Sequence, residues 1–325
     1  MVAHYIERFA GLRTSAGPAR WPAITRHRAP HKPLLLLAVM DLFAQGTITS
    51  NLIELTPDLG ELFTLYWARV MPPDRHGNIA LPFFHLRSDG FWHLVPQPGK
   101  EAVLAAARQI RSVHQLRDTV LGARLDDELY TLLRIEESRN VLRTVLIETY
   151  FAPDMQPALA EQGAINLDAF HYSLTLLEQA RAQHIEERPA DAESYQPAVR
   201  DQGFRCAIVT AYKHRCALCG IRMVTPDGHS VVDAAHIVPW SISHNDDPRN
   251  GMALCRLCHW TFDEGLMGVS PSYTVIVSPQ LGAHHNIPGH LLTLVNRKIM
   301  GPSEQYLWPD LDALSWHRQH VFHRG

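Results

Sequence analysis

The chain has 325 residues, of which 46% are hydrophobic and 19% charged, and its formal net charge is −3. That length favours two domains, because a single hydrophobic core usually stops growing near roughly 250–300 residues. The sequence contains no apolar run of about 18 residues, which excludes a spanning helix. The first residues also lack the basic, apolar and small-residue order of a secretory signal. We therefore expect a cytoplasmic protein with no membrane partner.

The charge is distributed unevenly, although a small net charge does not by itself indicate a nucleic-acid partner. Residues 1–40 contain six Arg or Lys side chains against one acid, Glu7, and His27 lies in the same segment. Such a basic segment fits either contact with DNA phosphates or an ordinary solvated terminus.

Two helices are predicted early in the chain. Residues 33–43 are apolar nearly all round, with Pro33 in the first turn and Gly46 after the last, which is typical of a buried helix. Residues 61–70 predict the second helix.

A β-hairpin and further helices are expected next. Residues 79–84 and 91–95 are short, aromatic-rich apolar stretches separated by the turn-forming residues 88–90. Helical spacing of apolar residues over 101–150 predicts two or three more helices. The N-terminal block is therefore a mixture of α and β structure.

A polar, proline-containing stretch separates this block from the rest of the chain. It begins near residue 183 and has little to bury, so we interpret 171–199 as a linker between domains at 1–170 and 200–325. A helix over 200–214 then precedes a cysteine-rich region.

Four of the five cysteines form two C-x-x-C pairs, Cys216 with Cys219 and Cys255 with Cys258, separated by 35 residues. In a cytosolic protein, paired C-x-x-C motifs indicate zinc more readily than disulfides. Four thiolates complete a tetrahedral site with no open position. The pattern therefore predicts a structural Zn²⁺ ion.

Three polar residues are framed by these cysteines. His236 ends a short strand over 230–236, Asn250 follows 14 residues later, and His259 comes directly after the last cysteine. The whole pattern, C-x2-C … A-A-H-I-x-P … N-G-x-x-L-C-x2-C-H-x-x-F-D, resembles the HNH endonuclease family in its four-cysteine branch, over roughly 200–275. Taken singly, each residue has an ordinary structural explanation.

The resemblance implies a role for each residue in DNA phosphodiester hydrolysis. His236 would be the general base, since a histidine titrates near neutrality. Asn250 would fix the loop and orient the histidine ring through its side-chain carbonyl. His259, on a helix, would hold one catalytic Mg²⁺ or Mn²⁺ ion. Many HNH sites have an acidic ligand where Ala235 stands, and Asp233, on the same face of the strand, is the candidate second ligand.

Asp263 stands one helical turn after His259 and could also approach the metal. We favour a structural role for it, as a cap or brace.

The N-terminal block resembles the sulfur-binding domain of McrA-like, modification-dependent (type IV) restriction endonucleases, over about 20–155. The resemblance rests on His31-Lys32-Pro33-Leu-Leu-Leu-Leu, on Leu81-Pro82-Phe83-Phe84-His85-Leu86 and on Ser88-Asp89-Gly90-Phe91-Trp92.

This resemblance implies recognition of phosphorothioate DNA. Leu81, Pro82 and His85 would line an apolar cup for the sulfur, with His31 and Lys32 approaching the DNA backbone. Family members often have an aromatic residue at position 81 and a small one at 85. The structural alternative is that residues 81–84 form a core-facing strand.

The sequence thus predicts an α+β protein: an N-terminal mixed α/β DNA-recognition domain and a C-terminal ββα-metal (HNH) domain with a four-cysteine zinc site. The expected partner is modified double-stranded DNA, and cutting both strands favours a homodimer. Two other functions stay open: an HNH nuclease that reads methylated or hydroxymethylated bases, and a non-catalytic zinc-ribbon DNA-binding protein.

Overall fold

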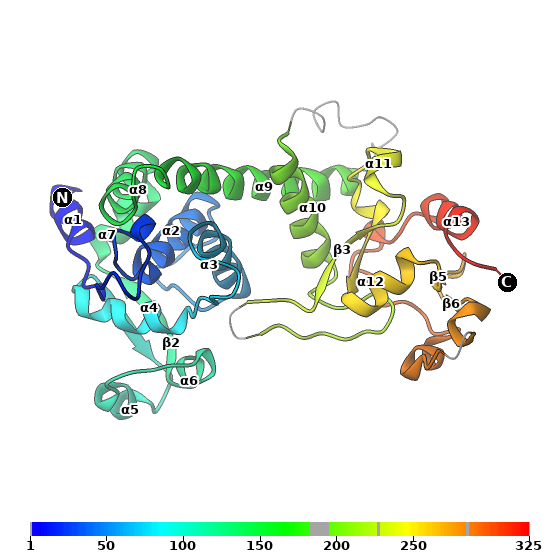
Figure 1. Cartoon of the computed structure of the whole chain (residues 1–325), viewed down its shortest axis with the longest axis horizontal. Coiled ribbons are helices and arrows are strands. Elements are labelled where there is room, and N and C mark those ends of the chain that lie inside the picture. The colour runs from blue at the N-terminus through cyan, green and yellow to red at the C-terminus, as the bar shows by residue number, and fades with distance from the viewer. Residues whose placement is uncertain (1, 183–194, 226–227, 284–285, 325) are drawn as a thin grey trace. The chain divides into compact units, whose positions relative to one another are not determined.

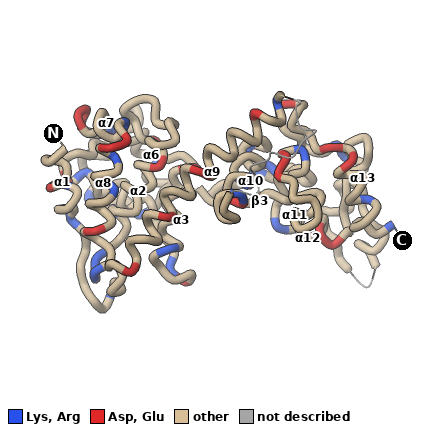
Figure 2. The backbone as a smooth tube through the Cα atoms, turned by 90° about the horizontal axis from the view of Figure 1, so that it is seen from above, with Lys and Arg blue, Asp and Glu red and all other residues tan. Residues whose placement is uncertain are grey.

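A computed structural model describes residues 2–182, 195–225, 228–283 and 286–324 (Figure 1). The chain divides into two compact units, unit 1 (Met1–Leu167 with Thr225–His229) and unit 2 (Asp168–Val224 with Ser230–Gly325). Acidic and basic residues are interspersed along both units (Figure 2). Across the described ranges, every helix is too short or too polar to cross a membrane.

Unit 1 is mainly helical and has one small sheet. Its helices are α1 (Val2–Ala10), α2 (His31–Ala44), α3 (Pro57–Val70), α4 (Ala80–His85), α5 (Glu101–Ala106), α6 (Val113–Thr119), α7 (Asp127–Arg134), α8 (Glu136–Tyr150) and the first part of α9 (Gln156–Ala182). Its strands, β1 (Trp92–Pro96) and β2 (Val120–Leu125), pair antiparallel. Helix α2 packs against α3, α4, α7 and α8 and so lies at the centre of the core.

The central position of α2 follows from its sequence. Leu34 to Leu37 are each at most 2% exposed, as a helix that is apolar all round requires. The one buried acid in this helix, Asp41, bonds to Arg143 Nη2 at 2.6 Å and to Asn166 Nδ2 at 2.7 Å, so its charge is compensated. The predicted helices at 33–43 and 61–70 are both confirmed as parts of α2 and α3.

The hairpin expected between 79–84 and 91–95 is wrong. Residues 80–85 form α4, and the Asn78 side chain just before it accepts a hydrogen bond from the Ala80 amide at 3.0 Å. Three consecutive residues, Pro82 to Phe84, are buried, a pattern that a core-facing helix produces and an alternating strand does not. Gly90, at φ +84°, ends the following 3-10 turn.

The true partner of β1 lies in the segment where we expected only helices. Trp92 pairs with Leu125, and residues 101–150 contain four helices as well as β2. The buried positions of β2 do not alternate, and the register between the two strands shifts between Val95 and Pro96. A period-based reading therefore misses this strand.

The expected linker at 171–199 differs from the structure in its first part. Helix α9 continues to Ala182, and Tyr172, Leu176 and Ala180 are buried at spacings of four along it. These residues therefore pack as a helix face, whereas 183–194 lie outside the described residues. Helix α10 (Pro197–Ala211) covers most of the helix expected over 200–214.

Unit 2 contains the ββα arrangement. Its other elements are β3 (Val232–His236), α11 (Trp240–Ser243), β4 (Gly251–Cys255), α12 (Arg256–Asp263), β5 (Met267–Val269), β6 (Val275–Val277) and α13 (Leu311–His320). Strands β3 and β4 pair antiparallel, with His236 opposite Gly251, and β5 pairs with β6. Helix α12 follows β4 directly and packs on β3, β4 and β5. The expected mixture of α and β structure with a C-terminal ββα arrangement is confirmed.

Helix α10 lies close against this hairpin because Gly251 has no side chain. A Cβ atom at Gly251 would lie 2.5 Å from Ile208 Cδ1 and 2.8 Å from Phe204 Cζ. The glycine thus permits the approach that places Phe204 beside the end of β3.

Candidate functional site

His236, at the end of β3, is held on two sides. Its Nε2 lies 2.8 Å from Asp246 Oδ1, in the loop between α11 and β4. Its ring stacks on Phe204 of α10, with centroids 3.8 Å apart and planes at 6°. These two contacts fix the ring, and the side chain is still 21% exposed, so the ring stays accessible to solvent. A general base needs both properties.

Asn250 is buried and fixes the loop that follows β3. Its Oδ1 accepts from the Val238 amide at 2.9 Å, and its Nδ2 donates to the carbonyls of Val238 and Asn245. The structure therefore places its side-chain carbonyl on the backbone, while the contact to the His236 ring comes from Asp246.

His259 lies on α12, where its Nε2 is 3.4 Å from Asp263 Oδ2. Adjacent ligands of an octahedral divalent ion with bonds of about 2.1 Å are separated by roughly 3 Å, so this pair fits two positions around one ion. Asp233 of β3 has a different neighbour, since its Oδ1 lies 2.9 Å from Arg205 Nε. The structure therefore brings Asp263, rather than Asp233, next to His259.

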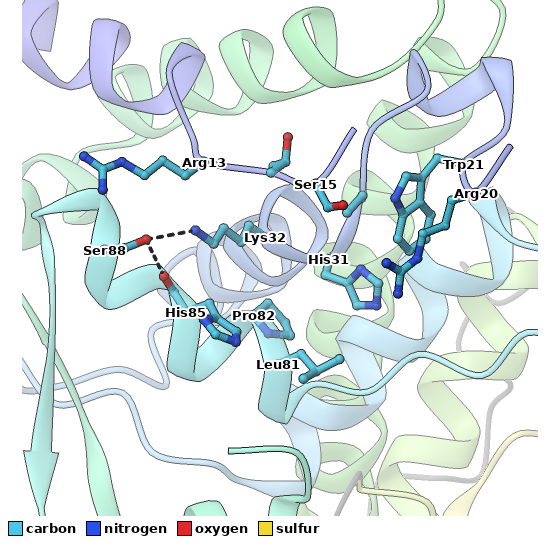
Figure 3. A pocket seen from close by; sticks show the side chains of 12 residues that line it. Arg13, Ser15, Arg20, Trp21, His31, Lys32, Leu81, Pro82, His85 and Ser88 are labelled. Carbon is cyan, nitrogen blue, oxygen red and sulfur yellow. Dashed lines mark hydrogen bonds between the residues drawn. The ribbon is translucent and has the colours of Figure 1, made fainter. Parts of the chain in front are cut away.

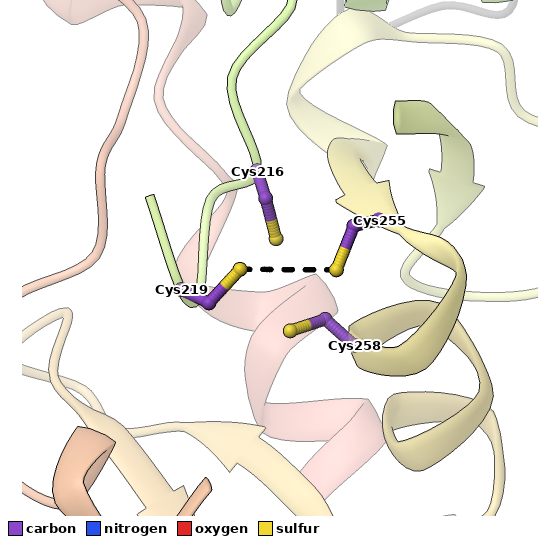
Figure 4. A group of neighbouring side chains, drawn as sticks. All are labelled: Cys216, Cys219, Cys255 and Cys258. Carbon is purple, nitrogen blue, oxygen red and sulfur yellow. Dashed lines mark hydrogen bonds between the residues drawn. The ribbon is translucent and has the colours of Figure 1, made fainter. Parts of the chain in front are cut away.

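The four cysteines converge in unit 2 (Figure 4). Their Sγ atoms all lie within 4.8 Å of one another, and those of Cys219 and Cys255 are 3.7 Å apart. Tetrahedral zinc with Zn–S bonds of about 2.3 Å separates its sulfurs by roughly 3.8 Å, so the cluster fits such an ion. Hydrogen bonds from the neighbouring thiols, chiefly Cys216, lower the pKa of Cys255.

Within the described ranges, this cluster is the one group of three or more His, Cys, Asp or Glu side chains close enough to share a metal ion. It could hold zinc, as the sequence predicts.

Unit 1 contains a cavity of about 490 Å³ that is lined by every predicted sulfur-site residue (Figure 3). The lining residues come from two segments of the chain and are Arg13, Thr14, Ser15, Arg20, Trp21, Ala29, His31, Lys32, Leu81, Pro82, His85 and Ser88. Figure 3 shows Leu81, Pro82 and His85 along α4, facing the same space as His31 at the start of α2.

The cavity is less basic than its sequence suggests. Lys32 is buried and its Nζ lies 2.6 Å from Asp89 Oδ2, so its charge is neutralised inside the protein. Burial lowers the pKa of His31 to about 4, and the nearby Arg20 guanidinium contributes to the shift. His31 is therefore a neutral ring at pH 7, held at 4.7 Å from Trp67 and 5.4 Å from Trp21 between ring centroids.

Burial also lowers the pKa of His85, with smaller contributions from Lys32 and Arg87. Arg13 and Arg20 also line the cavity and bring two further guanidinium groups to it.

Sequence reasoning missed Asp246 and Trp21. Asp246 lies ten residues after His236 with no recognisable spacing, although its position beside Asp247 and Pro248 marks a tight loop. Trp21 lies in an irregular segment where no periodicity could assign it to the cavity.

Comparison with known families assigns both units. Residues 6–166 match the family described as the ScoMcrA-like DNA sulfur-binding domain, and residues 216–270 match the HNH endonuclease family. The chain thus contains a ScoMcrA-like DNA sulfur-binding domain over 6–166 and an HNH endonuclease domain with a four-cysteine cluster over 216–270.

Among solved structures, the chain is similar to a modification-dependent restriction endonuclease, TagI. The two are 24% identical over 36% of this chain, with a TM-score of 0.27. The chain covers 37% of the length of that protein. None of the curated proteins compared with the chain matches it.

Proposed function

We propose that this protein is a modification-dependent restriction endonuclease that recognises phosphorothioate-modified double-stranded DNA through unit 1 and hydrolyses phosphodiester bonds through unit 2. The observation that carries the proposal is the cavity of unit 1, where residues about fifty positions apart, His31 and Leu81, line one space in a sulfur-binding domain.

The chemistry of the cavity suits sulfur better than oxygen. Pro82 is buried and Leu81 half-buried, so they offer an apolar surface with no hydrogen-bond donor. An oxygen placed there would lose its hydrogen bonds to water, whereas the larger sulfur accepts such bonds poorly and loses less. The neutral His31 ring adds to this surface, and Arg13 and Arg20 supply charge for the DNA backbone.

In unit 2, His236 acts as the general base that takes the proton from the attacking water. Its fixed ring and exposed edge support this role, and Asn250 holds the loop that follows it. His259 would hold one Mg²⁺ or Mn²⁺ ion, with Asp263 as the second protein ligand that its 3.4 Å separation favours and Asp233 as the alternative. When bound, such an ion neutralises charge on the phosphate and the leaving oxygen.

The four cysteines hold a structural Zn²⁺ ion. Cys216 and Cys219 precede β3, whereas Cys255 ends β4 and Cys258 lies on α12. An ion bound by all four would join the segment 216–219 to the β3–β4 hairpin and to α12, which would keep the distance between His236 and His259 constant. Because each chain has one such nuclease site, cutting both strands would use a homodimer.

The test is a cleavage assay with phosphorothioate-containing plasmid, Mg²⁺ or Mn²⁺, and the wild-type protein beside His236→Ala. We expect cleavage by the wild type and a loss of about 10²–10⁴-fold in the variant, the usual contribution of a general base. DNA binding by unit 1 should be unchanged. Binding without cleavage by the wild type would instead favour a non-catalytic DNA-binding protein.

A further inference from the structure

We propose that Asp246 is a positioning residue for the nuclease reaction: it fixes the tautomer of His236 so that Nδ1 is the nitrogen that accepts the proton from water. This inference rests on the proposed nuclease function. It adds to the His-Asn-His set a carboxylate that acts through the histidine.

The first argument is the hydrogen bond between the two side chains. His236 Nε2 and Asp246 Oδ1 are 2.8 Å apart, and the Asp246 side chain is only 2% exposed. An ionised carboxylate can only accept hydrogen bonds, so the ring nitrogen that faces it must carry the proton. In the neutral imidazole the lone pair is then on Nδ1.

The second argument is that the carboxylate is surrounded by donors. The Tyr172 hydroxyl, from α9, donates to Asp246 Oδ2 at 3.0 Å. Arg200 Nε, from α10, lies 3.7 Å from the same oxygen. The Tyr172 hydroxyl therefore holds the second oxygen by a hydrogen bond and Arg200 places a positive charge near it, which leaves the first oxygen for His236.

The donors are themselves held in place. The Arg200 side chain is 13% exposed, and its guanidinium carbon lies 3.6 Å from the ring centroid of Trp240. Tyr172 is 2% exposed, on the buried face of α9. Phe204 fixes the plane of the His236 ring by stacking on it. Rotation of the imidazole that would exchange its two nitrogens therefore breaks a buried contact.

The critical variant is Asp246→Asn. Arg200 can only donate hydrogen bonds, so the asparagine carbonyl should turn toward Arg200 and Tyr172. Its amide group then faces His236 Nε2 and makes that nitrogen the acceptor, which moves the ring proton to Nδ1. The base is blocked although the shape of the site is kept. We expect kcat to fall about 10²-fold or more, with DNA binding within about twofold of wild type.

Asp201→Asn is the matched control. Asp201 is the other carboxylate on Arg200, at 2.6 Å from Nη2, but its side chain is 67% exposed and has no contact with His236 in the structure. We expect this variant to cleave at the wild-type rate. Tyr172→Phe removes one donor and leaves the carboxylate, so we expect a smaller loss, about three- to tenfold.

A spectroscopic readout separates positioning from general damage. In ¹⁵N-histidine-labelled protein, the His236 signals, identified by their loss in His236→Gln, should show the Nε2–H tautomer in the wild type and in Asp201→Asn. They should show the Nδ1–H tautomer in Asp246→Asn. Thermal unfolding of each variant establishes that it is folded. If Asp246→Asn does not fold, the tautomer of the wild type and the rate of Tyr172→Phe decide the question.

A wild-type rate or an unchanged tautomer in folded Asp246→Asn would overturn the inference. So would an Nδ1–H tautomer in the wild type. A failure of the proposed function gives a different result. If His236→Ala cleaved DNA at the wild-type rate, His236 would not be the general base. If His236→Ala is inactive and Asp246→Asn is fully active, the nuclease mechanism stands and the role of Asp246 is rejected.

Discussion

The Phe204 ring on α10 lies flat against the His236 ring on β3, with centroids 3.8 Å apart and planes at 6°. This contact connects the packing of the nuclease unit with its chemistry. Phe204 is 3% exposed and belongs to the core, whereas His236 retains an exposed edge. One face of the proposed base is therefore positioned by the hydrophobic core itself.

Phe204→Leu should consequently reduce catalysis more than stability. Leucine fills much of the same volume, so we expect a loss of about 1 kcal/mol in the free energy of unfolding. Without the flat ring, His236 gains freedom to tilt, and misplacement on the scale of 1 Å can reduce a rate up to 10²-fold. We expect kcat for cleavage to fall about ten- to hundredfold, with chemical denaturation as the stability measurement.

Ile208→Val is the matched control, because Ile208 lies on the same helix and packs against Gly251, whereas the ring that stacks on His236 is that of Phe204. It should cost about 0.5–1.5 kcal/mol and leave the rate unchanged. Equal rates in Phe204→Leu and Ile208→Val would contradict the role of the stacking contact.

The cysteine cluster predicts a metal that folding requires. Elemental analysis should find about one zinc per chain that survives mild EDTA treatment. Cys258→Ser should lose the zinc and unfold unit 2, because Cys258 is buried at the start of α12 beside three other thiols. Cys206→Ser, outside the cluster, should keep both the zinc and the fold. A well-folded Cys258→Ser protein without zinc would refute the structural role of the ion.

Lys32 and Arg20 should respond differently to removal, although both line the cavity of unit 1. Lys32→Ala leaves Asp89 with an uncompensated, buried charge, which typically costs 3–5 kcal/mol. Arg20→Ala removes a cation that lies over the Trp21 ring and faces the cavity, so it should weaken DNA binding and flatten its salt dependence without unfolding. Calorimetry and salt-dependent binding measure the two effects. A stable Lys32→Ala protein with a reduced salt slope would assign Lys32 to the phosphates instead.

Acid should destabilise unit 2 through His317. Burial lowers its pKa to about 4 and the nearby Arg318 adds to the shift, although the hydrogen bond from Nε2 to the Phe262 carbonyl at 2.9 Å opposes it. Nδ1 is buried with no partner in the structure as described. Between pH 6.5 and 4 the unfolded chain therefore binds more protons than the folded one, and stability falls with falling pH. This stability is fully present above pH 6.5, and the total loss is about 3 kcal/mol.

Thermal unfolding of wild type and His317→Leu across this pH range measures that contribution. The leucine variant should start less stable at neutral pH, having lost a hydrogen bond, but lose less stability on acidification. Parallel pH profiles for the two proteins would show that His317 does not titrate on unfolding.

The structure of unit 2 could be predicted from the sequence more accurately than that of unit 1, for a physical reason. Metal-binding cysteines and the residues between them lie at fixed spacings on a short hairpin and helix, so His236 and His259 could be placed on β3 and α12 in advance. In unit 1, residues 79–84 are apolar in a way that fits a strand or a buried helix equally well. Only the tertiary packing selects α4, and it pairs β1 with a strand about thirty residues further on.

Charge compensation was likewise invisible in the sequence. From the sequence alone Lys32 is predicted to bind phosphate, but in the fold its amine lies 2.6 Å from the carboxylate of Asp89, 57 residues away. The role proposed for Asp246 likewise depends on its contacts with α9 and α10. Such partners come from the fold, whereas motif spacing gives the residue types alone.

A comparison of modified with unmodified DNA tests whether unit 1 directs the nuclease to phosphorothioates. The protein is given two duplexes of identical sequence at matched salt, one with a single phosphorothioate, and the affinity and the cleavage rate are measured for each. The apolar surface of Leu81 and Pro82 predicts tighter binding of the modified duplex by about 1–3 kcal/mol, and Pro82→Asp, checked for folding by circular dichroism, should abolish this difference. Equal affinity and equal cleavage of both duplexes would show that unit 1 does not recognise the sulfur and would leave modified bases as the substrate to examine.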